Sequence, residues 1–109
     1  MVSGIEVHPG MATPHPANAV LIGKKEINNY VLAVIRLFSE GAEEVIIRAR
    51  GKNICKAVDT AERVRHMYMR NLVVKDVKIG SEEIVDESGR KRTVSTIEII
   101  LAKPPEEES

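Results

Sequence analysis

Basic side chains stand at two junctions where an apolar stretch typical of a strand gives way to a helical pattern. Lys24 and Lys25 follow a glycine at the first junction, and Arg50 and Lys52 flank a glycine at the second. A helix start offers unpaired backbone N–H donors and a partial positive charge, so cations fixed beside it attract anions. Each junction therefore has the chemistry of an anion-binding site. The alternative is an ordinary strand end with solvated basic side chains.

A third group of cations, Arg90, Lys91 and Arg92, follows the turn residues 86–89 of an expected β-hairpin. The strand period of two places Arg90 and Arg92 on one face and Lys91 on the other. Because adjacent like charges repel, we expect residues 85–93 to form a mobile arm that lacks order in the free protein and becomes ordered on a nucleic acid. Arg90 or Arg92 is expected in a narrow minor groove, where the negative potential is enhanced. The alternative is an arm that only adds charge outside the groove.

Hydrophobic periodicity predicts the elements that position these cations. Strands are expected at about 19–22, 44–50, 73–85 and 90–102, and helices at about 27–38 and 52–70. Gly41 suits the position just after the first helix. The expected inner stripe of the second helix is Ile54, Ala57, Val58, Ala61 and Val64, with Tyr68 as a further candidate. The order βαβαββ predicts an α+β fold (an α/β two-layer sandwich) in which a mixed four-stranded sheet carries two helices on one face.

This order brings the basic groups together. Strand–helix–strand crossovers are right-handed and make their strands parallel, so the carboxyl ends of the first two strands share one edge of the sheet. If the strand at 73–85 runs in the same direction, the hairpin projects from that edge as well. The resulting polyanion-binding face would consist of Lys24, Lys25, Arg50, Lys52, Arg90, Lys91 and Arg92. Phosphate contacts from such a face give affinity and little sequence specificity.

Length and charge define the domain. A chain of 109 residues forms one domain, with a core small enough to favour oligomerisation. Formal net charge is zero, but all 16 Lys and Arg residues lie within 18–103, whereas four of the 16 Asp and Glu residues lie outside. We therefore predict a net basic domain at 18–103, between a disordered proline-rich extension at 1–17 and a disordered acidic tail at 104–109.

Composition argues against several other kinds of partner. Aromatic residues make up 3% of the chain, so base stacking is not expected to be the main contact. The single Cys55 excludes an internal disulfide and fits a reducing compartment. No apolar run approaches the ~20 residues that span a bilayer, so we expect a soluble, intracellular protein without a membrane partner. His8, His15 and His66 lack metal-ligand spacing, and we predict no metal and no cofactor.

Two other classes of function were weighed. A nucleotide-binding enzyme would use the glycine–lysine junctions, but the Walker pattern GxxxxGK followed by Ser or Thr is incomplete in VLIGKKE. Asp59 and Glu62 have an ordinary explanation as local partners of Lys56, Arg63 and Arg65, so we predict no catalytic residue. An adaptor oligomer would use the apolar faces and leave the basic edge unused.

Three segments resemble the Alba family of archaeal chromatin proteins. They read VLIGKKEINNYVLAVI, EVIIRARGKNICKAVDTAERVR and GRKRTVSTIEIIL, and their GKK, ARG, KAVD and VSTIEI elements occur in the family's order within 18–103. The resemblance implies a fold similar to the C-terminal domain of translation initiation factor three. It also implies a homodimer that binds double-stranded DNA and RNA at the chromosome in the cytoplasm. The alternatives are a mainly RNA-binding protein of the same fold and a heterodimer with a close paralogue.

The resemblance further implies roles for individual residues. Lys24 and Lys25 match the lysine pair at the centre of the family's binding face, and one of them matches its acetylated lysine, which implies acetylating and deacetylating enzymes as partners. Arg50 and Lys52 match the basic pair after the second strand, where the second residue is commonly arginine. The family's hairpin arm matches residues 85–93. Tyr68 matches an aromatic residue at contacts between dimers on DNA. The extension and the acidic tail distinguish this chain from shorter members.

Overall fold

The computed structural model describes residues 17–105 and has the predicted order βαβαββ. Most of the expected extension and tail, residues 1–16 and 106–109, lies outside the described residues. The elements are β1 (Ala19–Leu21), α1 (Ile27–Ser39), β2 (Glu44–Arg50), a 3₁₀ turn (Gly51–Asn53), α2 (Ile54–Arg63), a π-helical turn (Val64–Tyr68), β3 (Val73–Val85) and β4 (Lys91–Ala102). Each strand agrees with its predicted bounds to within one residue.

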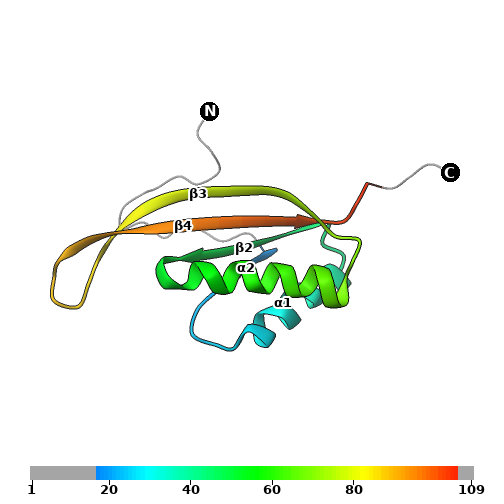
Figure 1. The fold of residues 1–109 in the computed structure, drawn as a ribbon, viewed down its shortest axis with the longest axis horizontal. Coiled ribbons are helices and arrows are strands. Elements are labelled where there is room, and N and C mark those ends of the chain that lie inside the picture. Colours follow the sequence, from blue (N-terminus) through cyan, green and yellow to red (C-terminus); the bar gives the residue numbers. More distant parts are fainter. Residues whose placement is uncertain (1–16, 106–109) are drawn as a thin grey trace.

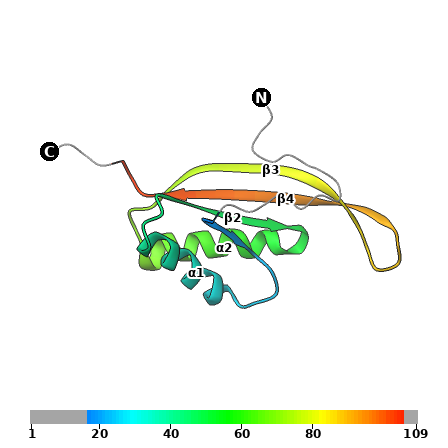
Figure 2. The ribbon, with the colours of Figure 1, turned by 180° about the vertical axis from the view of Figure 1, so that it is seen from behind.

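The four strands form one mixed sheet in the order β1-β2-β4-β3 (Figures 1 and 2). β1 is parallel to β2, whereas β4 is antiparallel to both β2 and β3. β3 therefore runs in the same direction as β1 and β2. Both helices lie on one face of the sheet, which confirms the predicted α+β architecture.

Buried apolar side chains from the two helices and from the sheet form one core between these layers. In β2 the inward residues Val45, Ile47 and Ala49 are buried and alternate with more exposed ones, as a strand covered on one face requires. Leu101 of β4 pairs with Val45 and is fully buried. Gly41 follows α1 with a φ of 109°, so the predicted helix end is confirmed.

The second helix differs from the prediction of one regular helix over 52–70, because it begins with the 3₁₀ turn and ends with the π-helical turn. Val58 and Tyr68, expected in its inner stripe, are 41% and 54% exposed. Thr60 is fully buried instead, because residues 57, 60, 61 and 64 form the stripe that packs on the core. The Thr60 hydroxyl donates to the Lys56 carbonyl oxygen at 2.8 Å, so its burial leaves no unsatisfied polar group.

β3 is an edge strand with an uncovered apolar side. Val77 and Ile79 pair with Ile99 and Ile97 of β4, so they lie on the helix-bearing face of the sheet. They are nevertheless 48% and 73% exposed. α2 packs against β2 and β4 and leaves the side chains of Val77 and Ile79 on β3 uncovered. The fold therefore presents an apolar strip beside its core.

Candidate nucleic-acid interface

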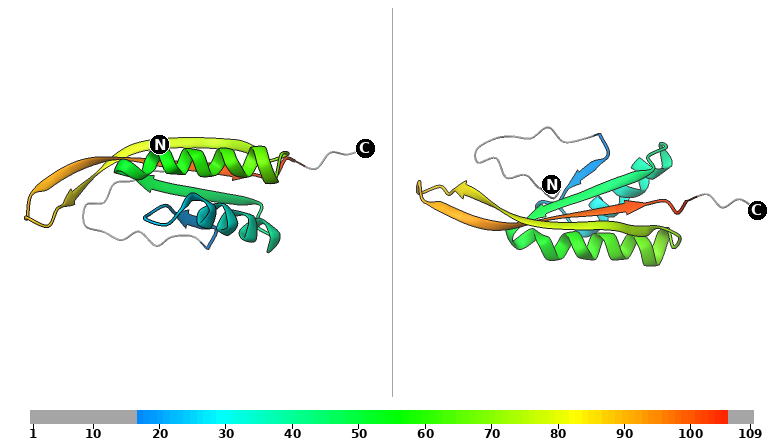
Figure 3. Two further views of the ribbon diagram at one scale, coloured as in Figure 1. Left: turned by 60° about the horizontal axis from the view of Figure 1, so that its bottom comes forward. Right: turned by 90° about the horizontal axis from the view of Figure 1, so that it is seen from above.

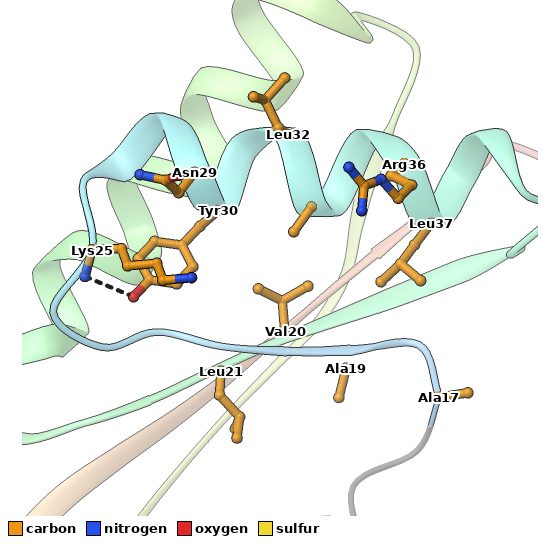
Figure 4. A pocket seen from close by; sticks show the side chains of 11 residues that line it. Ala17, Ala19, Val20, Leu21, Lys25, Asn29, Tyr30, Leu32, Arg36 and Leu37 are labelled. Carbon is orange, nitrogen blue, oxygen red and sulfur yellow. Dashed lines mark hydrogen bonds between the residues drawn. The ribbon is translucent and has the colours of Figure 1, made fainter.

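Lys24 and Lys25 lie in the loop between β1 and α1, and both are exposed. The side chains of Tyr30 and Lys56 form hydrogen bonds with the backbone of this loop. The Tyr30 hydroxyl accepts hydrogen bonds from the N–H groups of Gly23 at 2.8 Å and Lys25 at 3.0 Å, the second of which is drawn in Figure 4. Lys56 Nζ donates to the carbonyl oxygens of the same two residues at 2.7 and 2.9 Å. The structure thus fixes the backbone that carries the two lysines.

Arg50 and Lys52 flank the turn from β2 into the second helix, and both are exposed. Gly51 between them has a φ of 58°, a left-handed conformation that glycine adopts at little cost. No described side chain caps the 3₁₀ turn. The start of this helical segment therefore has two cations beside N–H groups that an anion can reach.

β3 and β4 continue beyond the rest of the sheet as a hairpin arm, residues 81–95. Arg50, the last residue of β2, pairs with Thr96, and Thr96 pairs with Gly80, so only β3 and β4 remain beyond this level. The pairing continues to Val85 and Lys91. Five residues of strand at about 3.4 Å each place the base of the turn about 17 Å beyond β2.

The tip of the arm closes in a hydrogen-bonded turn, and the expected ordering of residues 85–93 on a nucleic acid stays a prediction. Asp86 Oδ1 accepts hydrogen bonds from the Ser88 N–H, the Ser88 hydroxyl and the Arg90 N–H at 2.9, 2.7 and 3.0 Å. These bonds, the one from the Ser88 hydroxyl above all, lower the pKa of the Asp86 carboxyl. Gly89 completes the turn with a φ of 86°. The argument from charge repulsion overlooked this closure by Asp86.

The three cation groups meet at one edge of the molecule. Because β3 runs in the same direction as β1 and β2, the hairpin arm projects from the edge at which those two strands end (Figures 1 and 3). We call this set the cationic edge: Lys24, Lys25, Arg50, Lys52, Arg90, Lys91 and Arg92. All seven residues are exposed. Arg92 pairs with Ile84 and Lys91 with Val85, so their side chains lie on opposite faces of the arm, as the alternation predicted.

Ion pairing separates Arg50 from the rest of the cationic edge. Arg50 Nη1 lies 2.9 Å from Glu82 Oε1 at the base of the hairpin arm, and the Arg50 side chain is 59% exposed. Within residues 17–105, the other six cations form no ion pair. Arg48, two residues before Arg50, lies 2.7 Å from the nearly buried Glu98 and is only 22% exposed. Arg48 is thus paired within the sheet, whereas six cations of the cationic edge form no ion pair among residues 17–105.

Tyr68 ends the π-helical turn and is exposed beside a shallow hollow lined by Asn28, Val31, Leu32 and Tyr68 itself. Six residues before Tyr68, Glu62 lies 2.8 Å from His66 and 2.7 Å from Arg65. The hydrogen bond from His66 is the largest cause of the lowered pKa of Glu62. The local pairing predicted for Glu62 is therefore confirmed for Arg65.

Two residues that bear on the interface were not predicted. Lys56 was expected to pair with acidic neighbours on the helix surface, but its Nζ reaches the loop of Lys24 and Lys25 instead. The Glu82 carboxylate neutralises part of the positive charge of Arg50. Both contacts join residues more than 30 positions apart, so no local spacing predicts them. The shared edge of the two strand–helix junctions is the one signal that could have suggested the contact of Lys56.

The described part of the chain contains no metal-binding cluster and no helix that could span a membrane. Among residues 17–105, no three His, Cys, Asp or Glu side chains gather in a way that could hold a metal ion. No helix in this range has the length and apolar character needed to cross a membrane. Cys55 is a free, exposed cysteine.

Fold and site define a small α+β domain with a cationic edge and a projecting hairpin arm. A family model described as Alba matches residues 18–81 and ends at the base of that arm. Two archaeal relatives are named DNA/RNA-binding protein Alba. The one from Nanoarchaeum equitans is 59% identical over 86 residues, which cover 77% of this chain and 96% of the relative. The one from Methanocella arvoryzae is 47% identical over 87 residues, which cover 80% and 91%. This chain belongs to the Alba family.

Solved structures agree with the family assignment. Alba from Thermoplasma volcanium matches with a TM-score of 0.76 and 42% identity, covering 79% of this chain and all of the other. An Alba protein from Trypanosoma brucei matches with a TM-score of 0.67 and 27% identity, covering 83% of this chain and 72% of the other. The fold is thus shared with Alba proteins from an archaeon and a trypanosome.

Proposed function

We propose that this protein binds double-stranded DNA and RNA through the cationic edge, without sequence preference. The observation that carries the proposal is the gathering of seven exposed cations from three separate segments at one edge, six of them without an ion pair among the described residues. The relatives' name, DNA/RNA-binding protein, supports the same function. Phosphates are the common feature of both nucleic acids, and contacts to them are independent of sequence.

Each part of the cationic edge has its own task in this proposal. Lys24 and Lys25 meet phosphates at the centre, on a loop whose backbone is already fixed. Arg50 exchanges its carboxylate partner Glu82 for a phosphate. The hairpin arm, about 17 Å long, carries Arg90 or Arg92 into a minor groove, because Arg92 lies within the arm, Arg90 lies at its turn, and both are exposed.

A homodimer is the proposed working unit. The uncovered side chains of Val77 and Ile79 form an apolar strip on an edge strand, and such a strip gains free energy when a second copy covers it. Edge strands with unpaired backbone groups also favour pairing with another chain. A close paralogue with the same strip would form the heterodimer.

Contacts between dimers complete the proposed assembly on DNA. Tyr68 and the hollow beside it lie on the helices, away from β3, so they are available in a dimer formed through β3. Repeated contacts of this kind would coat and compact chromosomal DNA. Acetylation of Lys24 or Lys25, followed by deacetylation, would regulate binding by removing and restoring one charge.

The experiment is a titration of two unrelated DNA duplexes and one RNA duplex, each labelled and followed by fluorescence anisotropy. We expect similar affinities for the two DNA sequences and binding of the RNA. A strong preference for one DNA sequence, or no binding at all, would contradict the proposal. Parallel samples with ATP and Mg²⁺ test the enzyme alternative, for which we expect no nucleotide turnover. Crosslinking in cells that scores DNA and RNA together then decides which partner dominates.

A further inference from the structure

We propose that Tyr30 and Lys56 are positioning residues that hold the loop of Lys24 and Lys25 in the shape that meets phosphate. The inference rests on the proposed nucleic-acid binding and adds residues that contribute to it without touching the nucleic acid. It starts from two groups, the Tyr30 hydroxyl and the Lys56 ammonium, that both bond to the backbone of residues 23–25 in this loop.

The two side chains bond to complementary groups of the loop. The Tyr30 hydroxyl oxygen accepts from the N–H groups of Gly23 and Lys25, and Lys56 Nζ donates to the carbonyl oxygens of the same residues. All four distances lie between 2.7 and 3.0 Å, within the range of good hydrogen bonds. Lys56 Nζ also lies 5.9 Å from the centre of the Tyr30 ring, close enough for a cation–π attraction. Each residue therefore also supports the other.

Tyr30 and Lys56 form a fixed support for the loop, because Tyr30 is buried and the two residues come from two packed helices. Tyr30 is 8% exposed and packs in the core from α1, whereas Lys56 reaches across from α2. The Ile22 N–H still donates to the Arg48 carbonyl oxygen at 2.9 Å, but residues 23–25 form no backbone–backbone hydrogen bond within residues 17–105. A loop fixed before binding loses less conformational entropy when phosphate is bound. Lys56 thus uses its donors on the loop, whereas Lys24 and Lys25 keep theirs for the ligand.

Tyr30→Phe is the sharpest perturbation, because it removes the acceptor and changes neither charge nor ring packing. We expect DNA affinity to fall about fivefold, because the variant loses both hydrogen bonds to the loop and the net contribution of each is modest. Lys56→Met should cause a similar loss without changing the slope of log affinity on log salt. If Lys56 touched phosphate directly, Lys56→Met would make the slope less negative by about 0.9 for each copy of the residue. That result would show that the positioning role is wrong for Lys56.

A double-mutant cycle separates positioning from general destabilisation. In the Lys24→Gln/Lys25→Gln background the loop has no cation to position, so Tyr30→Phe should have no further effect on affinity. An equal fivefold loss in both backgrounds would overturn the inference, as would an unchanged affinity of Tyr30→Phe in the parent. Circular dichroism serves as the control for folding.

Amide hydrogen exchange provides a readout in the free protein. The amides of Gly23 and Lys25 should exchange faster in Tyr30→Phe, while that of Val34 in the middle of α1 stays protected. Unchanged exchange at both loop amides would contradict the positioning role of Tyr30 even if the parent protein binds nucleic acid. If the parent bound no nucleic acid, the proposed function itself would be wrong. Tyr30 and Lys56 would then have no role in binding, whatever the amide exchange shows.

Discussion

Replacing Ile79 by serine should weaken the dimer without unfolding the chain. Ile79 is 73% exposed in the single chain, so most of the free energy of burying it is still to be gained on association. Full burial of such a side chain is worth about 2 kcal/mol, and a symmetric dimer contains two copies. The loss should therefore be about 3 kcal/mol, which corresponds to a roughly hundredfold higher dissociation constant of the dimer.

Sedimentation equilibrium over a range of concentrations measures that constant. Leu32→Ser is the matched control, because Leu32 is also well exposed, at 61%, but lies on α1 beside the hollow of Tyr68. We expect the parent and Leu32→Ser to be dimers at micromolar concentration and Ile79→Ser to dissociate there. Equal dimer stability in Ile79→Ser and the parent would refute the assignment of the dimer interface to the strip of Val77 and Ile79.

Three further predictions concern nucleic-acid binding. Glu82→Gln should raise DNA affinity in filter-binding titrations about fivefold, because it releases Arg50 from its ion pair. The control Glu83→Gln removes the same charge from the other face of β3 and should raise the affinity less. Equal gains in the two variants would show a general charge effect. Tyr68→Ala should reduce cooperativity in electrophoretic shifts while light scattering still finds a dimer, and unchanged cooperativity would exclude Tyr68 from contacts between dimers. Replacing residues 85–91 by a two-residue turn should weaken DNA binding and leave the dimer intact, and an unaffected affinity would mean that the arm makes no contact.

Much of the fold follows from local pattern. The alternation of Val45, Ile47 and Ala49 with polar neighbours predicts β2, and Gly41 marks the end of α1, because strand and helix periods and the glycine conformation are properties of neighbouring residues. The gathering of cations at one edge also follows, since crossover handedness limits the arrangements of the strands.

The rest depends on contacts that no local pattern contains. Val58 fits the helical period of the inner stripe, but the position of α2 over β2 and β4 leaves it outside and buries Thr60. The closure of the hairpin turn by the Asp86 carboxylate was not predicted, because the charges of the tip were considered without its hydrogen bonds. Lys56 was interpreted as a surface residue because its partners, two carbonyl oxygens of a distant loop, carry no signal in side-chain type.

The salt dependence of DNA binding tests the central claim most directly. If about half of the fourteen cations in a dimer meet phosphates, the slope of log affinity on log salt should be roughly −6. The variant Lys24→Glu/Lys25→Glu should keep its fold by circular dichroism, because both side chains are exposed, and should lose most of its affinity with a slope roughly halved. A folded double variant that binds duplex DNA as tightly as the parent, with the same slope, would contradict the account of the cationic edge.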